Sequence, residues 1–203
     1  MFWLLLACAT HPVDVHHAGE LRKIMHKGDL SAHISLSDLQ NNENLYAIGA
    51  IEGLDGEIMV WNSELFLSQE RDSKVIISDN LDTSASLLVY AQVKKWKRIP
   101  VPASVQSTER LETFLVEQAT EIGIDSSKPF PFQLKGSIQE LDWHVIHWDP
   151  NQTKHSHQAH VESGAFGTLT DQDVEIIGFH SLSHKGVWTH HTRNVHMHFL
   201  NAD

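Results

Sequence analysis

Cysteine is nearly absent from this sequence and basic residues are outnumbered by acidic ones, and both shortages limit what the protein can be. The only cysteine of the 203 residues is Cys8, so the chain has neither an intrachain disulfide nor a cysteine-based zinc site. Any zinc must be held by histidine and carboxylate side chains. There are 15 Lys and Arg residues against 26 Asp and Glu, and the formal net charge is −11. Without a basic patch to neutralise phosphates, we expect no nucleic-acid partner.

Long hydrophobic runs are missing as well. The apolar run Phe2–Cys8 is too short to span a bilayer and no basic residues precede it. Its end, Leu5-Leu6-Ala7-Cys8, resembles a bacterial lipobox, where a signal segment is cut before a cysteine that is then lipidated. We therefore predict a lipoprotein-type signal segment over residues 1–14, a lipid anchor at Cys8, and an exported, periplasmic or membrane-anchored protein. The alternative is a buried N-terminal hydrophobic segment in a cytoplasmic protein.

The rest of the chain shows strand-like and helix-like patterns without internal repeats. The clearest helix begins after Ser107, a good N-cap, and ends at Gly123, and a shorter helix is expected before Gly28. Apolar alternation predicts strands over 45–50, 56–66, 75–77, 86–93, 132–138, 143–148, 174–179 and 186–200. These patterns predict an α+β fold with mixed and antiparallel β-strands in two sheet-rich parts, residues 15–105 and 106–203, and one main amphipathic helix.

Histidine is the compositional outlier. Of the 16 histidines, eleven lie from His144 onward. Near the end of the chain His196 and His198 alternate with Val195, Met197 and Phe199, so that a strand here has one apolar face and one face with two imidazoles. Two imidazoles on one face can reach a single zinc ion while the other face anchors the strand in a core. The alternative is a half-exposed edge strand that carries polar residues.

Two separated stretches together resemble the alpha-acetolactate decarboxylase family. The first, over 48–58, is similar to that family's strand, Leu-Asp-Gly-Glu turn and second strand, and contains Glu57. The second runs from 176–179 to 195–199, and is similar to the family's Val-Gly-Phe segment followed by His-Leu-His-Phe. Weaker likeness extends from about Gly28 to Asp203.

The resemblance implies a site in the cleft between the two sheet-rich parts. His196 and His198 would be ligands of Zn²⁺, and Glu57 would be the acid/base group that enters the site from the other part of the chain. Taken alone, a carboxylate at a tight turn is well placed to enter a cleft, although an exposed turn charge is the simpler interpretation.

Two features depart from the family's pattern. The family has a third histidine ligand shortly downstream, and the sequence stops five residues after His198, so either the chain is truncated or the ligand set has changed. His190 could join the pair only if the strand bends. There is no arginine between Arg110 and Arg193, where the family has one that faces the substrate; Lys154, His155 and His157 lie roughly at the place of that arginine.

The expected function is that of an acetolactate decarboxylase-like, zinc-dependent carboxy-lyase that converts a 2-hydroxy-3-keto acid such as acetolactate to acetoin and carbon dioxide. No organic cofactor is needed, because a zinc ion can stabilise the enediolate as a Lewis acid. The alternative is an exported metal- or ligand-binding protein that keeps the fold without the activity. A zinc hydrolase is a third option, which the lack of His-Glu-x-x-His and Gly-x-Ser-x-Gly disfavours. A homodimer is a further prediction.

Overall fold

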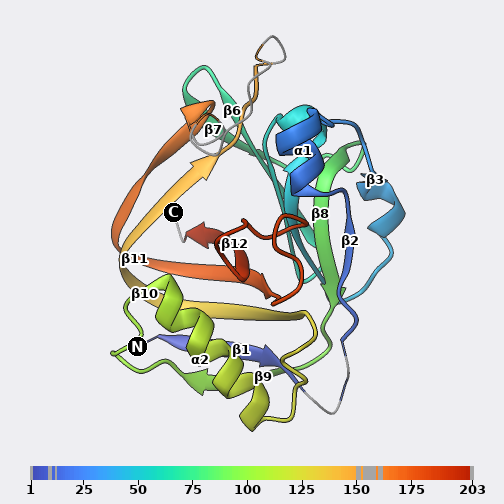
Figure 1. The fold of residues 1–203 in the computed structure, drawn as a ribbon. Helices are drawn as coiled ribbons and strands as arrows, with labels where there is room; N and C mark the ends of the chain where they lie inside the picture. The colour runs from blue at the N-terminus through green and yellow to red at the C-terminus, as the bar shows by residue number, and fades with distance from the viewer. Residues whose placement is uncertain are drawn as a thin grey trace.

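Two antiparallel β-sheets face each other in the computed structural model, which describes residues 2–8, 11, 13–149, 152, 159 and 162–201 (Figure 1). The seven-stranded sheet comprises, in spatial order, β2 (His16–Ala18), β8 (Ser84–Gln92), β4 (Leu45–Ile51), β5 (Glu57–Trp61), β6 (Glu64–Arg71) and β7 (Lys74–Ser78), with β3 (Ile34–Ser35) also paired to β8. The five-stranded sheet comprises β12 (Val195–Asn201), β11 (Ala165–His180), β10 (Phe130–Val145), β1 (Trp3–Ala7) and β9 (Trp96–Pro100). The helices are α1 (Leu21–Lys27) and α2 (Thr108–Glu121), with the 3₁₀ turns η1 (Leu36–Leu39) and η2 (Glu52–Leu54).

The strand pairing in the two sheets differs from the pairing that the sequence predicted. Every pairing between the named strands is antiparallel, so the predicted mixed sheet is wrong, and the protein is mostly β. The chain passes from the seven-stranded to the five-stranded sheet between β8 and β9, slightly before the predicted boundary.

Three strand predictions need correction. The expected strand over 56–66 is the β5–β6 hairpin, because Asn62 and Ser63 turn the chain with φ of 51° and 72°. The strands expected over 132–138 and 143–148 are one strand, β10, whose partner β11 runs beside it throughout. The expected strand over 186–200 is limited to β12, since the preceding segment folds as a loop that buries Trp188 to 1% exposure.

Alternation along the strands creates three apolar layers. Residues from both sheets form the layer between them; examples are Ile48 and Val89 from the seven-stranded sheet with Ile177 and Phe179 from the five-stranded sheet. A second layer lies between the five-stranded sheet and α2, and a third covers the outer face of the seven-stranded sheet. The space between the two sheets is therefore the place where side chains from distant parts of the sequence meet.

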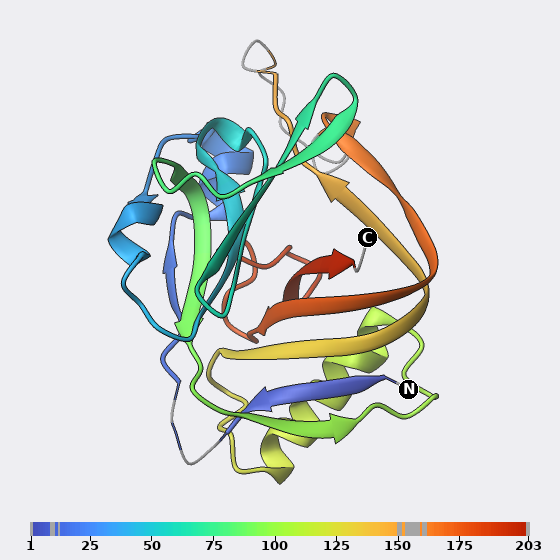
Figure 2. The ribbon, with the colours of Figure 1, turned by 180° about the vertical axis from the view of Figure 1, so that it is seen from behind.

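Helix α2 confirms the clearest prediction from the sequence. The Ser107 hydroxyl accepts a hydrogen bond from the backbone N–H of Arg110, and the helix buries Leu111, Phe114 and Leu115. It lies across the outer face of the five-stranded sheet (Figures 1 and 2). By burying that face, α2 leaves the opposite face of the sheet to form the site.

The N-terminal apolar segment is strand β1. It pairs with β10 on one side and β9 on the other, and Leu4 and Leu6 are fully buried. In this structure the segment is a buried interior strand, which cleavage before Cys8 would remove. Among the described helices, none has the length and apolar character that a membrane span requires. Lipidation of Cys8 and export stay predictions.

His180, at the end of β11, makes the stability of the fold depend on pH. Its side chain is fully buried and stacked on Phe130, its ring nitrogens have no hydrogen-bond partner among the described residues, and burial lowers its pKa from 6.5 to about 4. Between these two pH values the unfolded chain binds a proton that the native state does not. The free energy of unfolding should therefore fall as the pH drops from about 6.5 to about 4, by a total of about 3 kcal/mol from this residue.

The measurement is urea unfolding at pH 7 and pH 4.5 of the wild type and of His180→Phe, which keeps a ring against Phe130. The variant should lose less stability on acidification. The same loss in both proteins would contradict the assignment to His180.

Candidate active site

Strand β12 carries the two histidines of the predicted site on the face that turns toward the other sheet. His196 lies opposite Phe179 and His198 opposite Ile177 on β11, and both of these partners belong to the apolar layer between the sheets. Val195, Met197 and Phe199 pack in the layer under α2. The alternation expected from the sequence is therefore present in the structure.

Glu57 reaches the same space from the seven-stranded sheet. It is the first residue of β5 and has the parity of Met59, which lies in the layer between the sheets. The preceding Gly56 has φ 132°, and a Cβ atom there would lie 2.4 Å from the Ser68 carbonyl oxygen, so only glycine suits this turn. The turn aims the carboxylate of Glu57 at β12 and at the segment that follows β10.

The three side chains converge. The Nε2 atoms of His196 and His198 are 3.3 Å apart, and the Nε2 of His198 is 3.7 Å from the Oε2 of Glu57. The other carboxylate oxygen, Oε1, accepts a hydrogen bond of 3.3 Å from the backbone N–H of Ile146. The structure thus brings together residues that are about 140 positions apart in the sequence.

The site is poorly solvated, and this decides the charges of its groups. The side chains of His198 and Glu57 are 14% and 16% exposed. Burial raises the pKa of Glu57 to about 7 and lowers that of His196 to about 4, and it lowers the pKa of His198 well below 6.5. Both imidazoles are consequently neutral at neutral pH, which is the form that binds metals.

The pair of imidazoles fits two corners of a zinc site. With Zn–N bonds of about 2.0 Å, two ligands of a tetrahedral zinc are about 3.3 Å apart, which is the separation of the two Nε2 atoms. Across the described part of the chain, however, no group of three or more His, Cys, Asp or Glu side chains is arranged to hold a metal. His196 and His198 are therefore suitable ligands that need a further one.

The other residues considered from the sequence are placed differently. His190 lies in the loop before β12, where it contacts Thr192 at 2.8 Å and its ring lies tilted against that of His191. It does not form a three-residue metal-binding group with His196 and His198. Lys154, His155 and His157 lie outside the described residues.

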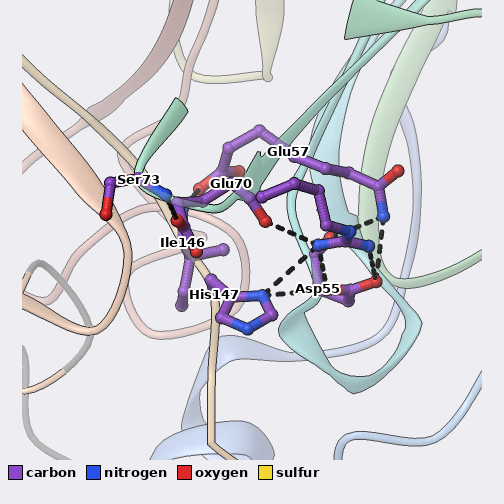
Figure 3. A network of polar contacts seen from close by, with 8 residues as sticks. Asp55, Glu57, Glu70, Ser73, Ile146 and His147 are labelled. Atoms are coloured by element: carbon purple, nitrogen blue, oxygen red, sulfur yellow. Dashed lines mark hydrogen bonds and ion pairs between the residues drawn. The ribbon is translucent and has the colours of Figure 1, made fainter. Parts of the chain in front are cut away.

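Two features of the site were missed in the sequence. His144 on β10 lies close enough to the pair for its charge to contribute to lowering the pKa of both His196 and His198. The available signal was the alternation of side chains along the expected strand over 143–148, which places His144 on one face of that strand. The second feature is a polar network of Asp55, Arg71 and His147 beside Glu57, shown in Figure 3. No spacing in the sequence links these three residues.

The class is that of a mostly β protein whose candidate active site, between two antiparallel sheets, holds a buried carboxyl group and two neutral imidazoles. The family model for alpha-acetolactate decarboxylase matches residues 16–203, and the chain belongs to this family.

The solved structures that resemble the chain agree with this assignment at the level of the fold. A Staphylococcus aureus protein of unknown function, described as similar to alpha-acetolactate decarboxylase, is 18% identical, with a TM-score of 0.69 over 93% of this chain and 75% of that one. The alpha-acetolactate decarboxylase of Bacillus subtilis strain 168 is 12% identical, with a TM-score of 0.67 and the same coverage. The acetolactate decarboxylase of Bacillus subtilis subspecies spizizenii is 13% identical, with a TM-score of 0.68 over 93% and 76%. No curated relative matches the chain by sequence.

Proposed function

We propose that this protein is a zinc-dependent carboxy-lyase that converts a 2-hydroxy-3-keto acid such as acetolactate to acetoin and carbon dioxide. The observation that carries the proposal is the meeting of Glu57 with His196 and His198 between the sheets, in a chain of the decarboxylase family. The family supplies the class of reaction, and the geometry supplies the residues for it.

In this proposal His196 and His198 hold the zinc ion through their Nε2 atoms, and a further ligand completes the site. A bound zinc would act as a Lewis acid toward the hydroxyl and keto oxygens of the substrate. The neighbouring apolar side chains Ile146, Ile177 and Phe179 limit the access of water.

Glu57 would move the proton. When the bond to the carboxylate carbon breaks, carbon dioxide leaves and its bonding electron pair stays on the remaining fragment. One proton must then be added to the carbon that lost carbon dioxide. The Oε2 atom of Glu57 is the carboxyl oxygen that faces the histidine pair, because Oε1 is held by Ile146. Delivery from this one side would set the handedness of the product.

In the family an arginine holds the substrate carboxylate. This chain has no arginine at that place, so another group has to bind the carboxylate. Lys154, His155 or His157 could take this role, and each would replace a planar two-pronged grip with a single contact. We therefore expect weaker substrate binding than an arginine would give.

Zinc content tests the metal site directly. The wild type should hold close to one zinc per chain when its third ligand is present, and His196→Ala should lose it, because two ligands rarely hold zinc tightly. The matched control is His191→Ala, which removes an exposed histidine of the preceding loop. Metal analysis after gel filtration gives the result, and equal zinc in wild type and His196→Ala would contradict the site.

The second candidate function is an exported metal- or ligand-binding protein without the activity. The lack of an arginine between Arg110 and Arg193 favours it, as does the lack of a third metal ligand among the described residues. Carbon dioxide release from several 2-hydroxy-3-keto acids by zinc-loaded protein separates the two functions. A lipid anchor at Cys8 and a homodimer accompany either function as predictions.

A further inference from the structure

Three consecutive residues after β10 each bond to the turn that carries Glu57. The backbone N–H of Ile146 donates to Glu57 Oε1 at 3.3 Å, the Nδ1 of His147 lies 2.9 Å from Asp55 Oδ1, and the backbone N–H of Trp148 donates to the Leu54 carbonyl at 3.0 Å. Strand β10 ends at Val145, so no strand ladder holds these residues. Their position depends on the turn, and the position of the turn depends on them.

Two side chains of the neighbouring strand β6 donate hydrogen bonds to the carboxylate of Asp55. Arg71 donates from Nη1 to Oδ1 at 2.8 Å and from Nη2 to Oδ2 at 2.6 Å, and the Nε2 of Gln69 donates to Oδ2 at 2.9 Å. Partial burial acts to raise the pKa of Asp55, but the hydrogen bonds from Arg71 and His147 outweigh it and lower the pKa. The carboxylate is therefore ionised at neutral pH and can only accept hydrogen bonds.

This fixes the role of His147. Because Asp55 cannot donate, the Nδ1 of His147 must carry the proton in their bond. The Nη1 of Arg71 is 3.5 Å from the same nitrogen, too far for a good bond, and its protons go to Asp55 and to the Glu70 carbonyl. Figure 3 shows His147 directed at Asp55. Asp55 thus joins a side chain from β6 to one from the segment that follows β10.

We infer that Asp55 and His147 are positioning residues for Glu57. His147 is covalently next to Ile146, so the bond to Asp55 sets where the N–H of Ile146 lies. That N–H binds Oε1 of Glu57, and this leaves Oε2 facing His198. Neither Asp55 nor His147 touches the reacting atoms in this assignment, which rests on the proposed function for its effect on turnover.

The test compares His147→Leu, Asp55→Ala and the conservative variant His147→Asn in full-length, zinc-loaded protein. An Asn amide nitrogen lies near the place of the imidazole Nδ1 and restores the donor. The first two variants should lower kcat about 10- to 100-fold, as expected for a misplaced proton-transfer group, with KM and zinc content within about threefold of wild type. His147→Asn should recover most of kcat. The control is His33→Leu, which removes another histidine paired with an aspartate, Asp29.

A second measurement is independent of the reaction. Hydrogen exchange of the Ile146 and Trp148 backbone amides should become at least 10-fold faster in His147→Leu and Asp55→Ala than in wild type or His33→Leu. Unchanged exchange at these amides overturns the proposal, as does a loss of kcat that His147→Asn does not recover. If the wild type releases no carbon dioxide from any substrate, the proposed function fails, and the exchange rates alone then decide whether the positioning holds.

Discussion

Replacing Glu57 by Gln should leave a folded protein that binds zinc and has lost most of its turnover. The amide keeps the shape of the side chain and can still bond the Ile146 N–H through its oxygen. It cannot deliver or accept the proton that decarboxylation requires. General acid–base catalysis contributes about 10² to 10⁴ in rate, so kcat should fall by about this factor.

The measurement is carbon dioxide release from acetolactate, with zinc content and thermal unfolding recorded on the same samples. Glu64→Gln is the matched control, because Glu64 is exposed at the start of the adjacent strand β6 and should not affect turnover. A Glu57→Gln protein with wild-type kcat would exclude Glu57 as the proton-transfer group. A protein that lost zinc as well would show instead that the carboxylate is a metal ligand.

Shortening a buried side chain of β1 should destabilise the whole molecule. Leu6 is fully buried where the five-stranded sheet packs against α2, and the strand is paired on both sides. Leu6→Ala should lower the free energy of unfolding by about 2 to 5 kcal/mol, through lost burial and the cavity left behind. A chain that begins at Cys8 loses the entire strand, and we expect it not to form the native five-stranded sheet.

Urea unfolding followed by circular dichroism checks both expectations. Leu182→Ala is the control, since Leu182 is 53% exposed and its truncation should change stability by less than about 0.5 kcal/mol. Native-like stability of the chain that starts at Cys8 would contradict a structural role for β1. The intact mass of the protein purified from its natural host would then show whether cleavage and lipidation at Cys8 occur.

The local features of the fold could be predicted from the sequence. Alternation at 195–199 predicted which face of β12 carries the imidazoles, because side chains of a strand point to opposite sides whatever the strand pairs with. Helix α2 was likewise predictable from its cap and its apolar spacing, which act within a few residues. The turn at Glu57 and the histidine pair entered the prediction through resemblance to the family.

The pairing of the strands and the contacts between distant side chains depend on the tertiary structure. Nothing local in Phe2–Cys8 distinguishes a leader from a strand, because both need a short apolar run; pairing with β9 and β10 makes it an interior strand. The contacts of Glu57 with His198, and of Asp55 with Arg71 and His147, join residues 16 to about 140 positions apart. Such contacts depend on the packing of two sheets and on the path of the chain after β10, and no periodicity in the sequence records them.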